Sequence, residues 1–167
     1  MFDELPRTRR DFIAVAATAT ACAVLPRIAN AYDEQSVSAI NVDSKGVILK
    51  GYDAVSYFAA GGPVQGSSSY SVSHDGAVYW FASAANRDVF KANPGKYTPS
   101  FGGFCAMGVA MGKKLDVDPQ LWRIVDGKLH LNVHKAAQTR WLEDVKGNLL
   151  QADKNWPGIK DKMPKAL

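Results

Sequence analysis

Two stretches of the chain alternate hydrophobic and polar residues around an Asp-Gly pair. In residues 69–81 the pair is Asp75-Gly76, and in residues 121–133 it is Asp126-Gly127. Alternation is typical of strands with one buried face, and Asp-Gly accommodates the positive φ angles of a two-residue hairpin turn. The sequence therefore predicts two β-hairpins, and we expect them to form an antiparallel sheet.

Hydrophobic residues at helical spacing mark the segments on either side of the first hairpin. Residues 51–58 carry this spacing behind Asp53, whose carboxylate can cap a short helix by accepting backbone N–H bonds. Ser83 precedes the same pattern in residues 84–91, and serine is a favoured helix N-cap. We expect short helices in both places.

The C-terminal part of the chain predicts further helices. Residues 135–145 are amphipathic, and Gly147 is expected to break this helix before residues 149–156. Asp118-Pro119 predicts a helical turn ahead of the second hairpin. Together the patterns indicate an α+β fold in which two hairpins are packed by short helices and by a C-terminal helix.

The first 31 residues contain the parts of an export signal in their usual order. Arg9-Arg10 precedes an uncharged run in residues 13–26, and Ala29-Asn30-Ala31 offers the small residues that signal peptidase recognises. We expect residues 1–31 to be a twin-arginine signal peptide that is cleaved after Ala31, which would make the protein periplasmic. The apolar run is too short to predict a membrane span.

Length, composition and charge indicate one domain of ordinary size. The chain has 167 residues, 47% of them hydrophobic, and a formal net charge of +4. After the signal we expect a lead-in arm in residues 32–46, the folded domain in residues 47–156, and a mobile basic tail in residues 157–167. No run of lysine and arginine is interleaved with aromatic residues, so we expect no nucleic-acid partner.

The chain has two cysteines, Cys22 and Cys105. Cleavage after Ala31 removes the first. The alternative is a lipoprotein with an acylated Cys22, although the preceding residues lack the usual leucine. A single remaining thiol cannot form an internal disulfide, so in an oxidising compartment we expect Cys105 to be buried, ligated or used chemically.

Cys105 lies in a glycine-rich segment, residues 97–112, together with Met107 and Met111. A thiol and two thioethers are soft donors, which favour copper(I) over magnesium or calcium. An extended backbone would turn Cys105 and Met107 to the same side, whereas a helix would pair Met107 with Met111. The structural alternative is that Cys105 packs as a small buried hydrophobe.

A metal site here needs at least one more donor from elsewhere in the chain. In residues 128–133 the leucines and Val133 share one face of the predicted strand, so His130, Asn132 and His134 share the other. If the strand extends to His134, about 13 Å separates these two histidines, so they cannot bind one ion together. His130 is our candidate for the further ligand, and Asp53 is the other.

Several short motifs, in their order and spacing, resemble a YHS domain of the exported bacterial branch. The resemblance covers residues 47–156 in outline, and its motifs are Gly51-Tyr-Asp, Tyr79-x-Phe-x-Ser83, Asn86-Arg87, Phe90, Asn93-Pro94, Tyr97 and Phe101-Gly-Gly-Phe-Cys-Ala106. It implies a small α+β module, often described as metal-binding. Ser56 and Ala82 stand where the cysteine-bearing members carry cysteine, which leaves Cys105 as the only thiolate and excludes a zinc site of several cysteines.

From these features we expect a periplasmic metal-binding module, most plausibly for copper(I), with Cys105, Met107, Met111 and His130 as ligands. A periplasmic protein partner is a second expectation. The alternatives are an interaction or scaffold domain that binds no metal and, less favoured, a cysteine-dependent enzyme, because no motif places a base beside the thiol. Haem binding, with Cys105 or a histidine as axial ligand, stays open.

Overall fold

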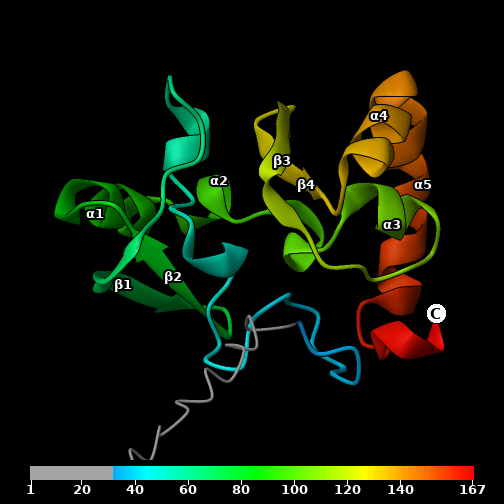
Figure 1. Ribbon diagram of the computed structural model, residues 1–167, viewed down its shortest axis with the longest axis horizontal. Coiled ribbons are helices and arrows are strands. Elements are labelled where there is room, and N and C mark those ends of the chain that lie inside the picture. Colours follow the sequence, from blue (N-terminus) through cyan, green and yellow to red (C-terminus); the bar gives the residue numbers. More distant parts are fainter. Residues whose placement is uncertain (1–31) are drawn as a thin grey trace, which may run out of the picture.

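The computed structural model describes residues 32–167, so the expected signal peptide and Cys22 lie outside the described residues. Figure 1 shows the first hairpin and α1 at one side, the second hairpin in the middle, and the C-terminal helices at the other side. In chain order the helices and strands are β1 (Ser67–His74), β2 (Ala77–Phe81), α1 (Ala84–Ala92), α2 (Pro94–Tyr97), α3 (Ala106–Ala110), β3 (Asp118–Val125), β4 (Lys128–Asn132), α4 (Lys135–Glu143) and α5 (Val145–Ile159). Four 3₁₀ helices complete them, namely η1 (Leu49–Gly51), η2 (Ser56–Phe58), η3 (Ser100–Gly103) and η4 (Pro164–Ala166).

Both predicted hairpins are present, and the α+β class is confirmed. β1 pairs with β2, and β3 with β4, each through a turn whose Asp-Gly pair has positive φ at both residues. The hairpins form two separate two-stranded sheets. Their inner edges are already occupied, because Val47 bridges to Val78 of β2, while Pro99 and Cys105 bridge to β4. Short irregular segments therefore take the positions that the other hairpin would need.

Asp53 has a different structural role from the one expected. Residues 51–58 form no regular helix, only the 3₁₀ turn of η2. The Asp53 side chain is fully buried, and it accepts hydrogen bonds from Val55 N (2.8 Å), Ala82 N (2.9 Å) and Asn86 Nδ2 (2.6 Å). It thus connects this segment to the junction between β2 and α1, where Ser83 caps α1 as predicted.

The second half departs from the sequence expectation at two helix boundaries. Asp118-Pro119 begins strand β3, since Asp118 pairs with Asn132, and forms no helical turn. Gly147 lies inside α5 and does not end a helix. The break falls at Asp144, whose side chain accepts a hydrogen bond from Gly147 N and so caps the new helix.

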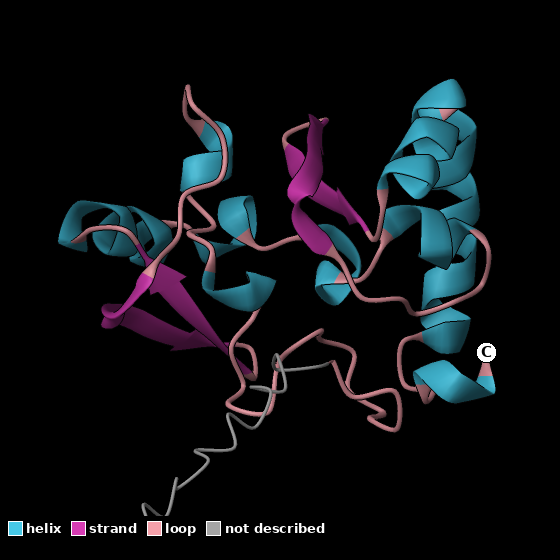
Figure 2. Cartoon of the chain, viewed as in Figure 1, coloured by secondary structure: helices cyan, strands magenta, loops and turns pink. Residues whose placement is uncertain are grey.

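Residues 157–167, expected to be a mobile tail, are packed against the arm. Lys114 is fully buried, and its ammonium group donates to Ser38 O (2.7 Å), Lys160 O (2.8 Å) and Lys162 O (2.8 Å). Lys165 N also donates to Glu34 O. Figure 2 shows the arm as a loop that passes close to the C-terminal residues. One buried cation thus holds both ends of the described chain.

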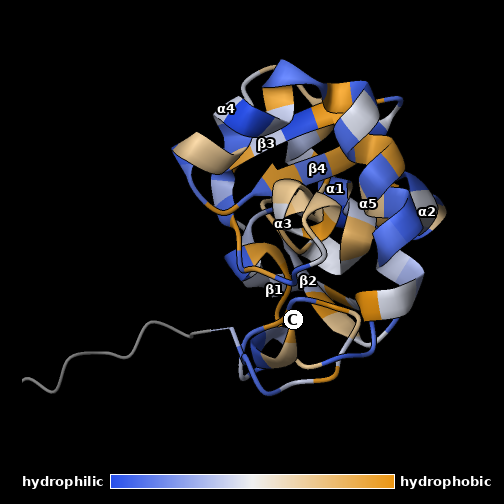
Figure 3. Cartoon of the chain, turned by 90° about the vertical axis from the view of Figure 1, so that its right-hand side faces the viewer, coloured by the Kyte–Doolittle hydropathy of each residue, from blue (hydrophilic) through white to orange (hydrophobic). Residues whose placement is uncertain are grey.

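The hydrophobic core runs through both halves, with Trp141, Phe81 and Phe90 among its largest fully buried side chains. Every residue of α3 is buried, and this helix packs on α5. In Figure 3 the α3 ribbon carries the colours of hydrophobic or neutral residues. Within residues 32–167, no helix has the length and apolar character to cross a membrane.

The glycine-rich segment makes its closest backbone contact at Gly102. Phe101, Gly102 and Gly103 all have positive φ, and the Gly102 carbonyl accepts a hydrogen bond from Asn41 N (2.8 Å). A Cβ atom on Gly102 would lie 1.8 Å from the carbonyl oxygen of Ala39. No side chain can be accommodated there unless the arm moves away.

Gly102→Ala should lower the free energy of unfolding by about 3 kcal/mol, because it adds a backbone clash to the strain of positive φ. Gly112→Ala is the matched control, since Gly112 also has positive φ but open space around it, and it should cost about 1 kcal/mol. Urea denaturation measures both. Equal losses would show that the contact with the arm contributes nothing.

Lys114→Met should destabilise the protein by about 3 kcal/mol, because it removes the buried ammonium group and leaves three carbonyl oxygens without their charged donor. It should also make residues 160–167 sensitive to limited proteolysis. Lys113→Met is the control, since Lys113 is exposed, and it should change stability by less than about 0.5 kcal/mol. If both variants unfold at the same urea concentration, the ammonium group does not hold the arm and the tail together.

Candidate functional site

Cys105 is fully buried at the start of α3. The backbone N–H of Cys105 donates to Leu115 O (3.0 Å), and Cys105 forms a β-bridge with Leu131 of β4. The thiol sulfur accepts a hydrogen bond from Gly108 N (3.3 Å) and donates to Asn132 Oδ1 (3.7 Å). Burial raises the pKa of this thiol, although the backbone N–H groups around it act in the opposite direction. The group is therefore a protonated thiol at neutral pH.

Asn132 fixes the direction of the Cys105 hydrogen bond. Its Oδ1 also accepts from Met107 N (3.4 Å), and a backbone N–H can only donate, so the atom facing both groups is the oxygen. The sulfur must then supply its own proton to that oxygen. Asn132 is fully buried, and its Nδ2 has no hydrogen-bond partner among residues 32–167. Sequence reasoning gave Asn132 no role, although it placed the residue on the histidine face of the strand.

The three sulfur-bearing side chains of the predicted site line one cavity of about 400 Å³. Cys105 and Met107 form its inner wall, and Met111, which is 51% exposed, stands at its mouth. The α3 helix places Met107 and Met111 one turn apart, which is the helical alternative that the spacing allowed. The sulfur cavity, as we call it, thus unites three of the four candidate ligands.

His130 lies outside the sulfur cavity, so its expected place beside Cys105 is wrong. It is 4% exposed and packs between the rings of Phe101 and Trp141, with centroid distances of 5.9 and 5.8 Å. Burial lowers the pKa of His130 to about 4, despite the opposing charges of Asp153 and Asp126. The side chain lines a second cavity, which is described further below.

His134 is the histidine that lines the sulfur cavity. Its Nδ1 accepts a hydrogen bond from Ala137 N (3.1 Å), and the residue thereby caps α4. In neutral His134 the ring proton is therefore on Nε2, which makes that nitrogen a donor. With Nδ1 accepting this hydrogen bond and Nε2 carrying the proton, neutral His134 has no free lone pair for a metal ion. The two histidines line different cavities, and β4 ends at Asn132, before His134.

The remaining charged side chains in the described part of the chain form no group of three that is arranged for a hard metal ion. Asp53, the other candidate ligand, is enclosed at the β2–α1 junction by its three hydrogen bonds. Among residues 32–167 no group of three or more histidine, cysteine, aspartate or glutamate side chains is arranged to hold a metal ion.

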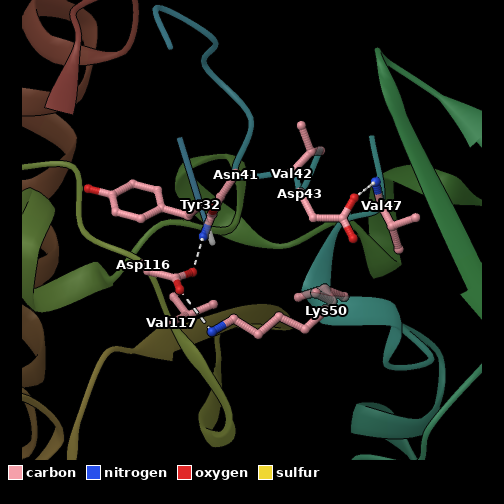
Figure 4. Close-up of a pocket in the computed structure, with 9 residues that line it drawn as sticks. Tyr32, Asn41, Val42, Asp43, Val47, Lys50, Asp116 and Val117 are labelled. Atoms are coloured by element: carbon pink, nitrogen blue, oxygen red, sulfur yellow. Dashed lines mark hydrogen bonds and ion pairs between the residues drawn. The ribbon is translucent and has the colours of Figure 1, made fainter. Parts of the chain in front are cut away.

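A further small cavity lies beside Asp116, between the arm and η1. Figure 4 shows the Asp116 carboxylate held by Lys50 Nζ (2.8 Å) and Asn41 Nδ2 (3.1 Å). The cavity has a volume of about 10 Å³, which is room for one water molecule. These polar contacts attach the arm to the domain and leave no space for a ligand.

Comparison with known proteins gives no match, since no family model, no curated protein and no solved structure corresponds to this chain. The likeness to YHS domains therefore depends on the residues quoted above.

Cys105 should react with Ellman's reagent at pH 8 more than about 100-fold more slowly in the native protein than in 8 M urea. The thiol is enclosed, and its raised pKa reduces the fraction of reactive thiolate at that pH. The rate of thionitrobenzoate release measures the difference. Equal rates in the two conditions would mean that the thiol is open to solvent.

Proposed function

We propose that the protein binds one soft metal ion, copper(I), in the sulfur cavity. The observation that carries this proposal is that Cys105, Met107 and Met111 line a single cavity although only two of them share a helical turn. Thiolate and thioether sulfur are the protein ligands that select copper(I). Cys105 and Met107 would hold the ion from the inner wall, and Met111 would close the site from its exposed position.

The charges around the cavity favour a monovalent ion. Copper(I) would replace the Cys105 proton, so a neutral thiol becomes a neutral copper thiolate and no net charge enters the interior. A divalent ion would leave an uncompensated positive charge in a buried site. Lys113 and Arg140 also line this cavity, and they would oppose added positive charge. Gly108 N already points at the sulfur and would stabilise the thiolate.

The sequence offers separate support for this function. The YHS resemblance implies a metal-binding module, and the missing cysteines at Ser56 and Ala82 direct attention to Cys105. The twin-arginine motif indicates export of a folded protein, a route that often carries proteins with a cofactor. We accordingly propose that the mature protein acts in the periplasm.

The second candidate is an interaction or scaffold domain in which Cys105 only packs the core. The observation in its favour is that the sulfur already accepts from Gly108 and donates to Asn132 within a fully buried setting. A catalytic role has less support, because within residues 32–167 no histidine is hydrogen-bonded to the thiol.

Copper(I) titration of the mature protein from the periplasm, under anaerobic conditions and against a copper(I) chelator, tests the proposal. We expect one equivalent bound. Cys105→Ser should weaken binding by more than about 100-fold and Met107→Leu by about 10-fold, since each removes a sulfur ligand. Met163→Leu is the control, because Met163 lies outside the cavity, and it should leave the affinity unchanged.

Elemental analysis of the wild type and of Cys105→Ser can contradict the proposal. Equal metal content in both proteins would eliminate Cys105 as a ligand. If the wild type binds no copper(I) and its urea midpoint is the same with and without chelator, the scaffold function replaces the metal function.

A further inference from the structure

A second cavity, of about 420 Å³, lies between η3, the turn of the β3–β4 hairpin and α5. Aromatic rings line it, namely those of Phe101, His130 and Trp156. Phe101 and Trp156 meet edge to face with their ring centroids 5.8 Å apart. We call this space the aromatic cavity. Its volume is within the range of small-molecule sites, and it shares no lining residue with the sulfur cavity.

His130 is the buried polar group of the aromatic cavity. Only 4% of the residue is exposed, and its Nδ1 has no hydrogen-bond partner among residues 32–167. Buried polar atoms without a partner cost free energy, so most are satisfied by protein, water or a ligand. The imidazole is uncharged at neutral pH because burial opposes its protonation. The cavity wall thus presents a neutral, incompletely bonded ring.

Two carboxylates give the aromatic cavity a negative character. Asp126 belongs to the hairpin turn and Asp153 to α5, and both line the cavity. Their charges favour protonation of His130, although burial outweighs them and lowers its pKa. Lys128 is the basic residue of the lining, but its Nζ donates to Gly95 O (2.8 Å) and is held there.

A neighbouring cavity of about 420 Å³ extends the aromatic cavity along α5. It shares four lining residues with the aromatic cavity, namely Val125, Asp126, Leu149 and Asp153. Lys146 lines only the far part. The two carboxylates therefore lie where the two spaces meet, with apolar and aromatic surface on the inner side. Within residues 32–167, His130, Asp126 and Asp153 do not form a group that is arranged to hold a metal ion.

We propose that the aromatic cavity binds a small organic cation, an ammonium group attached to an apolar or aromatic body. The ammonium group would lie between Asp126 and Asp153 and donate a hydrogen bond to the unpaired imidazole. The apolar body would pack against Phe101 and Trp156, whose ring faces also attract a cation. This site does not depend on the copper proposal, because the two cavities have no residue in common.

The test uses the full mature protein and three probes that share one ring, namely benzylammonium, benzyl alcohol and benzoate. Calorimetry gives the affinities, and the indole N–H resonance of Trp156 reports whether the cavity is occupied. Benzylammonium should bind at least about 10-fold more tightly than benzyl alcohol, since only the cation pairs with the carboxylates. Benzoate should not bind.

Single substitutions test which side chains contact the benzylammonium ion. Asp126→Asn and Asp153→Asn should each weaken benzylammonium binding by about 5-fold to 10-fold without affecting the fold, because both residues are exposed. His130→Phe keeps a ring between Phe101 and Trp141 and should weaken it by about 5-fold. Asp161→Asn is the control, because Asp161 is an exposed carboxylate outside the cavity, and should change nothing.

Equal affinity for benzyl alcohol and benzylammonium would overturn the proposal, as would benzylammonium binding that is insensitive to both aspartate variants. Failure of the Trp156 resonance to shift at millimolar benzylammonium would also overturn it. Copper(I) titration of the same variants should give wild-type values, so a failure here is distinguishable from a failure of the sulfur cavity.

Discussion

The constraint on which the rest of the structure depends is the close approach of residues 99–105 to β4 on one side and to the arm on the other. Pro99 and Cys105 bridge to β4, and between them the backbone turns through three successive residues of positive φ. Only a residue without a side chain can occupy Gly102, because Ala39 lies against it. This path buries Cys105, starts α3 directly after it, and directs Phe101 to the opposite end of β4.

Both candidate sites follow from that path together with the alternation of β4. His130 and Asn132 share one face of the strand and are about 7 Å apart along it. Within the glycine-rich segment, Cys105 forms a hydrogen bond with Asn132, and Phe101 packs against His130. One strand face therefore supplies both a lining residue of the aromatic cavity and the hydrogen-bond acceptor of the Cys105 thiol. The sequence identified this face correctly, but it could not show that the face is divided between two sites.

Local chemistry explains what could be predicted. The Asp-Gly turns, the Ser83 cap and the helical spacing of Met107 and Met111 each depend on residues a few positions apart. The errors at Asp53 and Asp118 concern groups whose partners are distant in sequence. From the sequence Asp53 is expected to cap a local helix, but in the fold its carboxylate also accepts hydrogen bonds from Ala82 and Asn86. A lysine such as Lys114 is expected at the surface. Its burial is made favourable by three carbonyl groups that come from both ends of the described chain.

The two proposed ligands would place positive charge differently, and burial explains why. In the sulfur cavity the donor is enclosed, so the incoming cation must replace a proton and leave the net charge unchanged. In the aromatic cavity the two carboxylates are exposed, so the ammonium group of the proposed ligand would remain partly hydrated while its apolar part is buried. A metal cation suits the first arrangement and an organic cation the second. The neutral imidazole of His130 fits the second case, because a protonated ring would repel the ligand that its neighbours attract.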